Sequence, residues 1–487
     1  MLFRRMYDSD LAHASYLIGC PGTREAIVID AARDIDRYLA EAAREGLRIV
    51  AAAETHIHAD FLSGTRELAE QLGARVLVSA EGGPDWQYGW LDAKAGGGSY
   101  EHQRLRHGDR FRLGGVEFEV AHTPGHTPEH VSFFVTDRRG GATDPMGIVT
   151  GDFVFVGDLG RPDLLETAAG QVGSQEEGAR QLFHSARRFL ELPDYLQVWP
   201  AHGAGSACGK ALGATPQSTV GYERRFNPAL LQLATERGFM DYMLDGQPEP
   251  PYYFGRMKRE NRDGPPLLGA LPRQRVLDAD AAQRLDRSRH VIVDTRPWPE
   301  FRAGHLPGSL WSPLGSNLIA TCGSYIAADQ EVCLVVDDEQ LDRAVRCLVR
   351  IGLSAVTAQV RPQSLAGGSA LGLVSTPEID VAEFAQRLAR GDGGPLDVRR
   401  AAEFAQGRIP GATNLAHTRL LPRLAEVPRD RPLVVSCKSG VRSAIACAFL
   451  ERQGVDVTNL RGGFDAWKRT LNLEIELGDA PGAPGAQ

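Results

Sequence analysis

Residues 54–61 read ETHIHADF, and this stretch decides how the first half of the chain is interpreted. It follows the apolar run RIVAAA of residues 48–53, so His56, His58 and Asp60 stand at the end of a predicted strand. Side chains at alternate positions of an extended segment point to one face. The spacing therefore predicts that three side chains able to bind a metal ion converge on one point.

Further groups of ligand-type side chains follow later strand-like runs. They are HTPGHTPEH with His122, His126 and His130, TGD with Asp152, and PAHG with His202. A lone histidine is usually a structural residue in a protein core. Four separate groups of His and Asp at predicted strand ends reverse that expectation and favour a metal site.

The composition is that of an ordinary globular protein with several domains. The chain has 487 residues and a formal net charge of −8, and it contains no long basic run. At roughly 100 to 200 residues per domain, this length predicts about two to four units. The charge disfavours nucleic-acid and membrane-surface partners. Because no apolar run of roughly 18 residues and no signal-peptide pattern is present, we expect a cytoplasmic protein.

The second half of the chain contains an internal repeat. VIVDTRPWPEFRAGHLPGSLW, which includes Asp294, recurs as PLDVRRAAEFAQGRIPGATNL, which includes Asp397, at an offset of 103 residues. LVVDDEQLDRA, from residue 334, matches LVVSCKSGVRSA, from residue 433, at an offset of 99. Two similar α/β domains in tandem are therefore predicted.

Strand-like and helix-like runs alternate over residues 1 to about 250, which indicates a layered α/β domain. A polar and then Pro- and Gly-rich stretch follows, which is typical of a linker. We therefore expect a first domain at 1–256, a linker at 257–273, repeat domains at 274–372 and 373–475, and a flexible tail at 476–487.

The set THxHxD, TPGHT, GD and PAHG resembles the metallo-β-lactamase fold. Within that superfamily, TGDFVFVGDLGRPDL and PAHGAGSACG are most similar to persulfide dioxygenases, including those fused to rhodanese domains. The resemblance implies an αββα sandwich and one Fe(II) held by His56, His126 and Asp152. Two imidazoles and one carboxylate leave three coordination positions open, which is typical of non-haem iron that binds substrate and dioxygen. Spacing alone does not exclude His58 as a ligand.

Three other polar residues of these motifs have two readings. His58, Asp60 and His202 either orient the ligands or bind a second metal ion. Phe61 stands where dinuclear members of the superfamily often have a histidine, and a phenyl ring cannot coordinate a metal. We therefore favour the orienting role.

Substrate contacts are expected from residues that follow the metal motifs. Arg161 either holds a substrate carboxylate or pairs with a buried carboxylate such as Asp163. Arg224 and Arg225 either contact the thiol carrier, as the resemblance implies, or belong to a solvated helix face. Cys208 either lies at the mouth of the site or is a structural thiol.

Both repeats resemble rhodanese-homology domains. In the second, Cys437 opens the loop CKSGVR before a predicted helix, where free amides, Lys438 and Arg442 favour the thiolate. Four residues separate Cys437 from Arg442, one fewer than in related phosphatase loops, and the tighter loop suits sulfur. The first repeat has Asp338 and Arg343 at these places and is predicted to be inactive, because a carboxylate cannot accept sulfane sulfur.

The other cysteines lack a functional pattern. Seven cysteines without a short CxxC spacing fit neither a disulfide framework nor a zinc ribbon. Cys333, Cys347 and Cys447 lie in apolar contexts and are expected in cores, as is the indole of Trp467.

Together the two resemblances imply a sulfide-oxidation enzyme. We expect a persulfide of glutathione, coenzyme A or a similar thiol to react with O2 to give sulfite, and Cys437 to transfer sulfane sulfur with thiosulfate formed or used. Fusion would raise the concentration of one site's product at the other. The alternatives are a glyoxalase II-like zinc thioester hydrolase with sulfurtransferase modules, and a sulfur-carrier or scaffold protein with a vestigial metal domain. The resemblance also implies a homo-oligomer.

Overall fold

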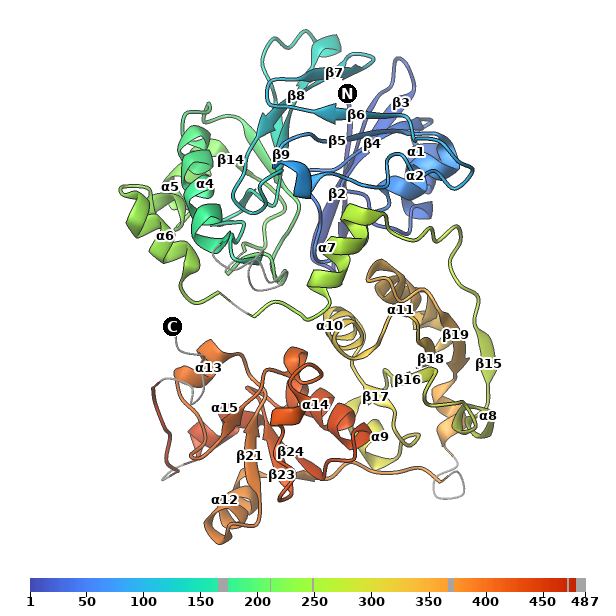
Figure 1. The fold of residues 1–487 in the computed structure, drawn as a ribbon, viewed down its shortest axis with the longest axis vertical. Coiled ribbons are helices and arrows are strands. Elements are labelled where there is room, and N and C mark those ends of the chain that lie inside the picture. Colours follow the sequence, from blue (N-terminus) through green and yellow to red (C-terminus); the bar gives the residue numbers. More distant parts are fainter. Residues whose placement is uncertain (165–173, 211, 248, 367–371, 471–472, 479–487) are drawn as a thin grey trace. The chain divides into compact units, whose positions relative to one another are not determined.

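The computed structural model describes residues 1–164, 174–210, 212–247, 249–366, 372–470 and 473–478 (Figure 1). The chain forms two compact units, the first being Met1–Ala270 with Val349–Gly352, and the second Leu271–Leu348 with Leu353–Gln487. Among the described residues, no helix is both long enough and apolar enough to cross a bilayer.

Two six-stranded sheets build the first unit. The first sheet has the order β1 (Leu2–Asp8), β2 (His13–Cys20), β3 (Glu25–Ile29), β4 (Arg48–Ala53), β5 (Arg75–Ser79) and β6 (His102–Leu105). The second has the order β14 (Ser218–Thr219), β13 (Gln197–Pro200), β10 (Gly147–Gly151), β9 (Val131–Asp137), β8 (Val116–His122) and β7 (Arg110–Leu113). A two-stranded ribbon of β11 (Val154–Phe155) and β12 (Asp158–Leu159) follows β10.

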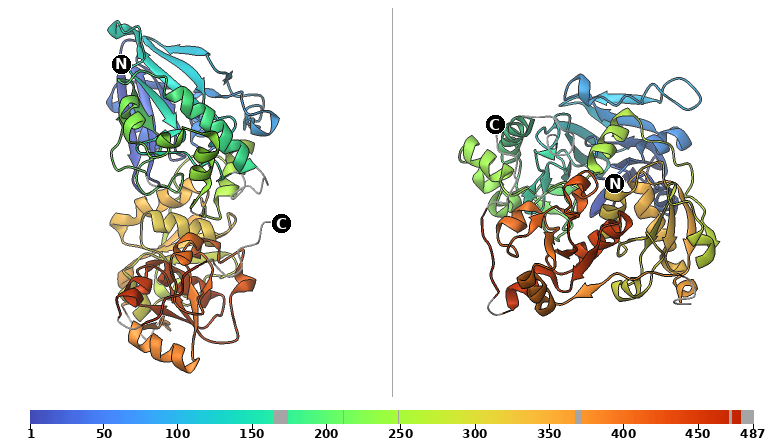
Figure 2. Two further views of the ribbon diagram at one scale, coloured as in Figure 1. Left: turned by 90° about the vertical axis from the view of Figure 1, so that its left-hand side faces the viewer. Right: turned by 60° about the horizontal axis from the view of Figure 1, so that its bottom comes forward.

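An apolar core joins the two sheets face to face. It includes Tyr16 and Ile29 from the first sheet and Phe133 and Trp199 from the second. Helices α1 (Asp36–Arg44) and α2 (Thr65–Leu72) bury Tyr38 and other apolar side chains against the outer face of the first sheet. Helices α4 (Ser174–Phe189) and α6 (Glu236–Leu244) cover the second sheet, as Figures 1 and 2 show. The predicted αββα sandwich is confirmed.

The second unit contains two five-stranded parallel sheets with one topology. Their orders are β15 (Arg275–Leu277), β19 (Val356–Val360), β18 (Glu331–Val335), β16 (His290–Asp294), β17 (Leu310–Trp311), and β20 (Glu378–Ile379), β24 (Val457–Leu460), β23 (Leu433–Ser436), β21 (Gly394–Asp397), β22 (Thr413–Asn414). Equivalent strands occupy equivalent places, so the sequence repeat is a repeat of the fold. The two rhodanese-like α/β domains are confirmed.

Helices flank both of these sheets. The first domain has α8 (Ala279–Gln283), α9 (Trp298–Ala303), α10 (Ser316–Tyr325) and α11 (Asp338–Arg350), and the second has α12 (Val381–Arg390), α13 (Ala401–Ala405), α14 (Val441–Arg452) and α15 (Gly463–Arg469). Tyr325 of α10 stacks on Phe449 of α14 at 4.1 Å between ring centroids, and its hydroxyl donates to the His417 carbonyl at 2.5 Å. The first repeat thus packs directly on the second.

The predicted linker at 257–273 is wrong at its start. Residues 257–263 belong to helix α7 (Phe254–Asp263), which buries Met257, Lys258 and Asn261 in the first unit. The sequence KRENRD is polar throughout, so it did not indicate a helix with a buried face. In the structure the buried positions 254, 257, 258 and 261 recur at the helical period.

The predicted tail at 476–487 also begins too early. Glu476 forms a backbone bridge with Arg408, and its carboxylate accepts from the Arg408 guanidinium. Residues 479–487 lie outside the described part of the chain, and the other domain bounds stay predictions.

Candidate functional site

His56, His126 and Asp152 come together at one edge of the sandwich. They follow the ends of β4, β8 and β10, and their ligand atoms lie within 4.8 Å of one another. Asp152 Oδ2 is 3.4 Å from His126 Nε2 and 3.9 Å from His56 Nε2. All three side chains are buried. The structure therefore assembles the three residues that the resemblance implies as iron ligands.

A buried hydrogen-bond chain orients the His56 ring. Thr55 Oγ1 donates to Asp30 Oδ2 at 2.9 Å and lies 2.9 Å from His56 Nδ1. Because the hydroxyl proton goes to Asp30, the hydroxyl oxygen accepts from His56 Nδ1–H. The lone pair of His56 is then on Nε2, the atom that faces Asp152.

Two backbone carbonyls set the tautomers of the other imidazoles. His126 Nδ1 donates to the Arg161 carbonyl, and His202 Nδ1 donates to the Ala12 carbonyl, both at 3.0 Å. A carbonyl only accepts, so each Nδ1 carries a proton and each Nε2 presents a lone pair in the neutral ring. These are the tautomers that metal-binding histidines adopt.

The Asp152 carboxylate tests whether a metal ion fits this site. Both of its oxygens are buried, and among the described residues no N–H or O–H group donates to them; the Cys208 thiol interacts with the carboxylate as a weak donor. Burial raises the pKa of Asp152 to about 6, against the opposing charge of His202. A buried carboxylate with so little hydrogen bonding is costly unless a cation lies beside it. Together with two imidazole lone pairs, this donor set fits Fe(II).

The backbone around Asp152 is held by His130 and Gly151. His130 Nε2 accepts the Asp152 amide at 3.1 Å, and burial lowers the pKa of His130 to about 3, so the ring stays a neutral acceptor. Gly151 has a φ of +52°, and a Cβ there would lie 2.6 Å from Thr55 Oγ1 and 2.7 Å from His130 Nε2. Only glycine fits at this position of the TGD motif. His130 thus positions Asp152.

A second group of ligand-type residues shares Asp152 with the first. It consists of Asp60, His202 and Cys208, and all three are buried. His202 Nε2 lies 3.4 Å from both Asp60 Oδ2 and Asp152 Oδ1. Burial and the Asp152 charge raise the pKa of Cys208 well above its usual value. The geometry is compatible with both predicted roles of Asp60 and His202, and it brings Cys208 into the site.

His58 belongs to another group of ligand-type residues, although its ring lies 4.2 Å from that of His56 between centroids. Its Nε2 lies 3.2 Å from Asp30 Oδ1 and 3.1 Å from Glu54 Oε2. Burial opposes protonation of His58, but the two carboxylates raise its pKa well above the usual value. The two imidazoles are therefore neighbours, but their ligand atoms fall in different groups.

The sequence analysis missed two residues of this buried network. Asp30 directly follows the apolar run EAIVI, which is the same signal that identified the other groups. The His13 ring packs against Phe61 at 4.2 Å between centroids, and Phe61 also packs against His58 at 4.5 Å. His13 lies inside a fully buried strand, where no sequence pattern distinguishes it from a core residue.

Both predicted substrate-binding arginines are engaged elsewhere. Arg161 is 1% exposed, and its guanidinium donates to Asp163 at 2.5 and 2.8 Å, so the two side chains form a buried ion pair. Arg224 bonds Asp194 and also donates to the carbonyls of Leu190 and Leu192 at 2.7 Å. It thereby ties α5 (Val220–Phe226) to the segment after α4. The exposed Arg225 shares this helix.

Cys437 lies between the end of β23 and the start of α14. Its Sγ accepts from the Gly440 amide at 3.1 Å and from the Ser443 hydroxyl at 3.5 Å. The amides at a helix start favour a negative sulfur. Arg442 forms a two-pronged pair with Glu403 at 2.6 and 2.7 Å, which fixes its guanidinium beside the loop.

The equivalent loop of the first repeat is built around a carboxylate. Asp338 accepts from Arg361 at 3.0 Å and from the Gln359 amide at 2.7 Å. Arg343 is exposed, as is Lys438 in the second repeat. The expected core residues Cys333, Cys347, Cys447 and Trp467 are all buried.

Comparisons with known proteins identify both parts of the chain. Residues 9–202 match the metallo-beta-lactamase superfamily, and residues 380–470 match the rhodanese-like domain. The mitochondrial persulfide dioxygenase ETHE1 of Mus musculus is 30% identical over 233 residues, which cover 47% of this chain and 76% of that protein.

Two further relatives extend this result. A sulfurtransferase of Allochromatium vinosum is 48% identical over 94 residues, covering 19% of this chain and 88% of its own. The crystal structure of a metallo-beta-lactamase from Staphylococcus aureus subsp. aureus COL superposes with a TM-score of 0.64 at 39% identity. That match covers 74% of this chain and 99% of the other chain.

Replacing one ligand should abolish metal retention. We expect His126→Ala to weaken metal binding by more than the roughly 10- to 100-fold that loss of an orienting partner costs. The matched control is His184→Ala, since His184 is exposed and lies outside the three ligand groups. Metal content measured by mass spectrometry after dialysis checks this. Equal metal content in both variants would contradict the assignment.

Proposed function

This chain belongs to the metallo-β-lactamase superfamily, as a fusion of an ETHE1-like domain with rhodanese-like domains, and we propose that it is a persulfide dioxygenase that also transfers sulfur. The observation that carries the proposal is the buried group of His56, His126 and Asp152 in the ETHE1-like part. The reaction is RSSH + O2 + H2O → RSH + SO3²⁻ + 2 H⁺. A cytoplasmic location and a homo-oligomer stay predictions.

We assign one ferrous ion to His56, His126 and Asp152. When bound, it supplies open coordination positions and the redox chemistry for dioxygen to react with sulfur. Thr55 and the Arg161 carbonyl hold the two imidazoles in the binding tautomer. These partners keep the ligand geometry fixed when substrate enters.

Other residues of the chain support the same site. His202 Nε2 lies 3.4 Å from both Asp152 Oδ1 and Asp60 Oδ2, so His202 and Asp60 border the site beside the second oxygen of Asp152. The rings of Phe61 and Phe155 are fully buried beside these side chains. They give these parts of the site apolar walls.

The second group favours one rival, a glyoxalase II-like zinc thioester hydrolase. Asp60, His202 and Cys208 offer ligands for a second ion, with Asp152 between the two positions. Two observations weigh against that rival. Phe61 cannot coordinate a metal ion, and His58 Nε2 lies beside the carboxylates of Asp30 and Glu54 instead of the second group.

Metal analysis combined with an oxygen electrode separates the two functions. We expect one iron per chain and oxygen uptake with glutathione persulfide. Two zinc ions per chain, with thioester cleavage and no oxygen uptake, would establish the hydrolase instead. An inert protein after reconstitution with iron would support the scaffold alternative.

Sulfur transfer is assigned to the second rhodanese-like domain. The Cys437 thiolate attacks the outer sulfur of thiosulfate, which forms a cysteine persulfide and releases sulfite. A thiol acceptor then takes the outer sulfur and regenerates the thiolate, and the reverse sequence makes thiosulfate. The Gly440 amide and the positive charges of Lys438 and Arg442 support the anionic sulfur.

Loss of the Cys437 thiol should separate the two activities. We expect Cys437→Ser to abolish thiosulfate sulfurtransfer and to leave oxygen uptake with glutathione persulfide at the wild-type rate. The matched control is Cys447→Ser, because Cys447 is a buried thiol on the adjoining helix. Unchanged sulfurtransfer in Cys437→Ser would refute the assignment.

The backbone of the Cys437 loop depends on Gly463. Its φ is +57°, and a Cβ there would overlap the Cys437 carbonyl oxygen and lie 2.8 Å from that of Lys438. Gly454 has a similar φ of +70° but open space around it. An alanine at either position would have the same backbone strain, but only an alanine at position 463 would also clash with the Cys437 loop.

Gly463→Ala should displace the loop and reduce sulfurtransfer, by about 100-fold for a shift near 1 Å. Gly454→Ala should lose only about 1 kcal/mol of stability. Sulfurtransfer rates and thermal unfolding of both variants test this. Equal sulfurtransfer in the two variants would exclude a positioning role for the clash.

A further inference from the structure

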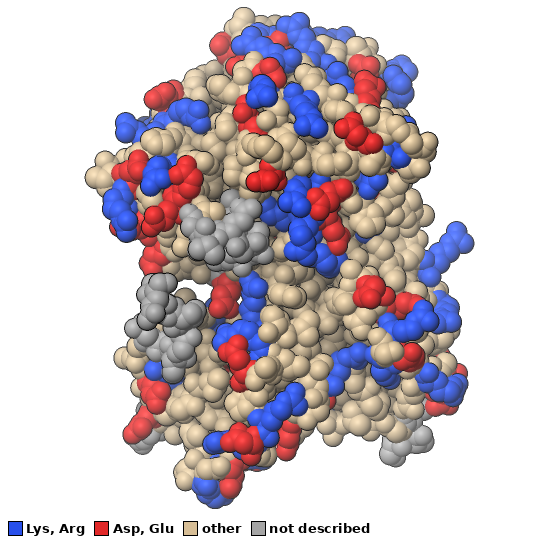
Figure 3. Space-filling model, viewed as in Figure 1, with Lys and Arg blue, Asp and Glu red and all other residues tan. Residues whose placement is uncertain are grey.

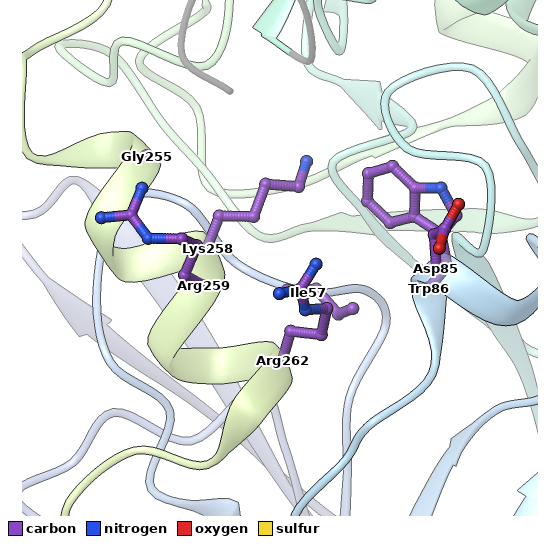
Figure 4. A pocket seen from close by; sticks show the side chains of 7 residues that line it. All are labelled: Ile57, Asp85, Trp86, Gly255, Lys258, Arg259 and Arg262. Atoms are coloured by element: carbon purple, nitrogen blue, oxygen red, sulfur yellow. The ribbon is translucent and has the colours of Figure 1, made fainter. Parts of the chain in front are cut away.

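The first unit holds a cationic pocket outside the residues assigned so far. Its volume is about 160 Å³, and its walls include Ile57, Trp86, Lys258, Arg259 and Arg262. Figure 4 shows Lys258 and Arg262 extending from helix α7 into the space that faces Trp86. Lys and Arg side chains also gather over α7 on the face shown in Figure 3.

The pocket adjoins the candidate metal centre. Ile57 directly follows His56 in the chain, and its amide donates to the buried Glu129 at 2.8 Å. Lys258 and Ile57 line the same pocket, so the Lys258 side chain and a residue adjacent to the proposed ligand His56 border one space.

Lys258 is a buried cation without a hydrogen-bonding partner. Its side chain is 8% exposed, and its Nζ lies 4.4 Å from the centroid of the Trp86 ring. Among the described residues it makes no hydrogen bond or ion pair. Burial lowers the pKa of Lys258 to about 8, opposed by the Glu129 charge, so the ammonium form prevails at neutral pH. A buried, unpaired ammonium favours an anionic ligand.

The two arginines of the pocket are available at its rim. Arg259 is exposed and has no ion-pair partner in the described part of the chain. Arg262 pairs at 2.7 Å with Asp263, a side chain that is 61% exposed, and such surface pairs exchange readily. Asp85 is the one acidic side chain on the pocket wall. The balance of charge therefore attracts a carboxylate or phosphate.

We propose that this pocket binds the anionic part of the thiol carrier, a carboxylate or a phosphate, while the persulfide sulfur lies at the candidate metal centre. The inference rests on the proposed dioxygenase function and specifies its substrate class as an anionic thiol persulfide. It also gives the carrier a binding site, since Arg161 is buried in its pair with Asp163 and Arg224 donates to the backbone carbonyls of Leu190 and Leu192.

Binding of carrier analogues without a thiol tests the pocket apart from turnover. We expect S-methylglutathione, which carries carboxylates, or S-methyl-coenzyme A, which carries phosphates, to bind the full-length protein in isothermal titration calorimetry. The double variant Arg259→Glu/Arg262→Glu should weaken that binding at least about tenfold. The matched control Arg237→Glu, at an arginine that is 77% exposed on α6, should bind as the wild type does.

The two analogues distinguish the anions. If the double variant weakens binding of S-methylglutathione, the pocket binds a carboxylate, and if it weakens binding of S-methyl-coenzyme A, the pocket binds a phosphate. The variant Lys258→Met tests the buried cation in the same way. Binding of neither analogue to the wild type, or equal binding by the wild type and the double variant, would overturn the proposal. Where S-methylglutathione is the analogue that depends on the arginines, equal affinity for its diethyl ester would also overturn the proposal.

Oxygen uptake keeps the two hypotheses distinguishable. In the double variant, KM for the anionic persulfide should rise about tenfold, and the preference for glutathione persulfide over its diethyl ester should fall by the same factor. A wild type that binds the analogues but takes up no oxygen with any persulfide would refute the dioxygenase function and leave the anion pocket standing.

Discussion

A buried carboxylate to which no N–H or O–H group donates among the described residues is the constraint on which the metal site of the first domain depends. Asp152 directs one oxygen toward His126, whose neutral ring presents a lone pair to it, and the other toward His202. Lone pairs and a carboxylate repel one another unless a cation lies between them. The folded sandwich is therefore destabilised by this uncompensated negative charge, and a bound metal ion would stabilise it.

The residues around this carboxylate explain why the site forms at strand ends. Gly151 brings the chain close to Thr55, and His130 accepts the amide of Asp152, so two sheets fix one carboxylate. Asp30 acts through Thr55 on the far ring nitrogen of His56. These contacts join segments more than 20 residues apart, so the site is only as well ordered as the packing of the two sheets.

Strand ends and repeats were predictable from the sequence, whereas side-chain directions were not. The runs before Asp152 and His202 predicted the strands that carry them, because β-branched residues and alternation are local signals. The partners of His58, Asp30 and Glu54, could not be predicted, because they depend on how the chain turns after β4. Lys258 was not predicted, because it reaches the site from helix α7, about 200 residues after the His56 motif. The sequence of that helix is mostly polar and does not reveal its buried face.

The two rhodanese-like domains show how one fold separates a reactive loop from a structural one. In the second repeat Cys437 precedes α14 and its sulfur accepts from the Gly440 amide, whereas in the first repeat Asp338 begins α11 and accepts from Arg361 and Gln359. The first copy therefore has a carboxylate held by side chains at the position of the thiol. Its remaining contribution is mechanical, since Tyr325 packs on Phe449 of the helix that begins at the Cys437 loop. The inactivity of the first copy stays a prediction, and its packing on this helix does not require a cysteine at position 338.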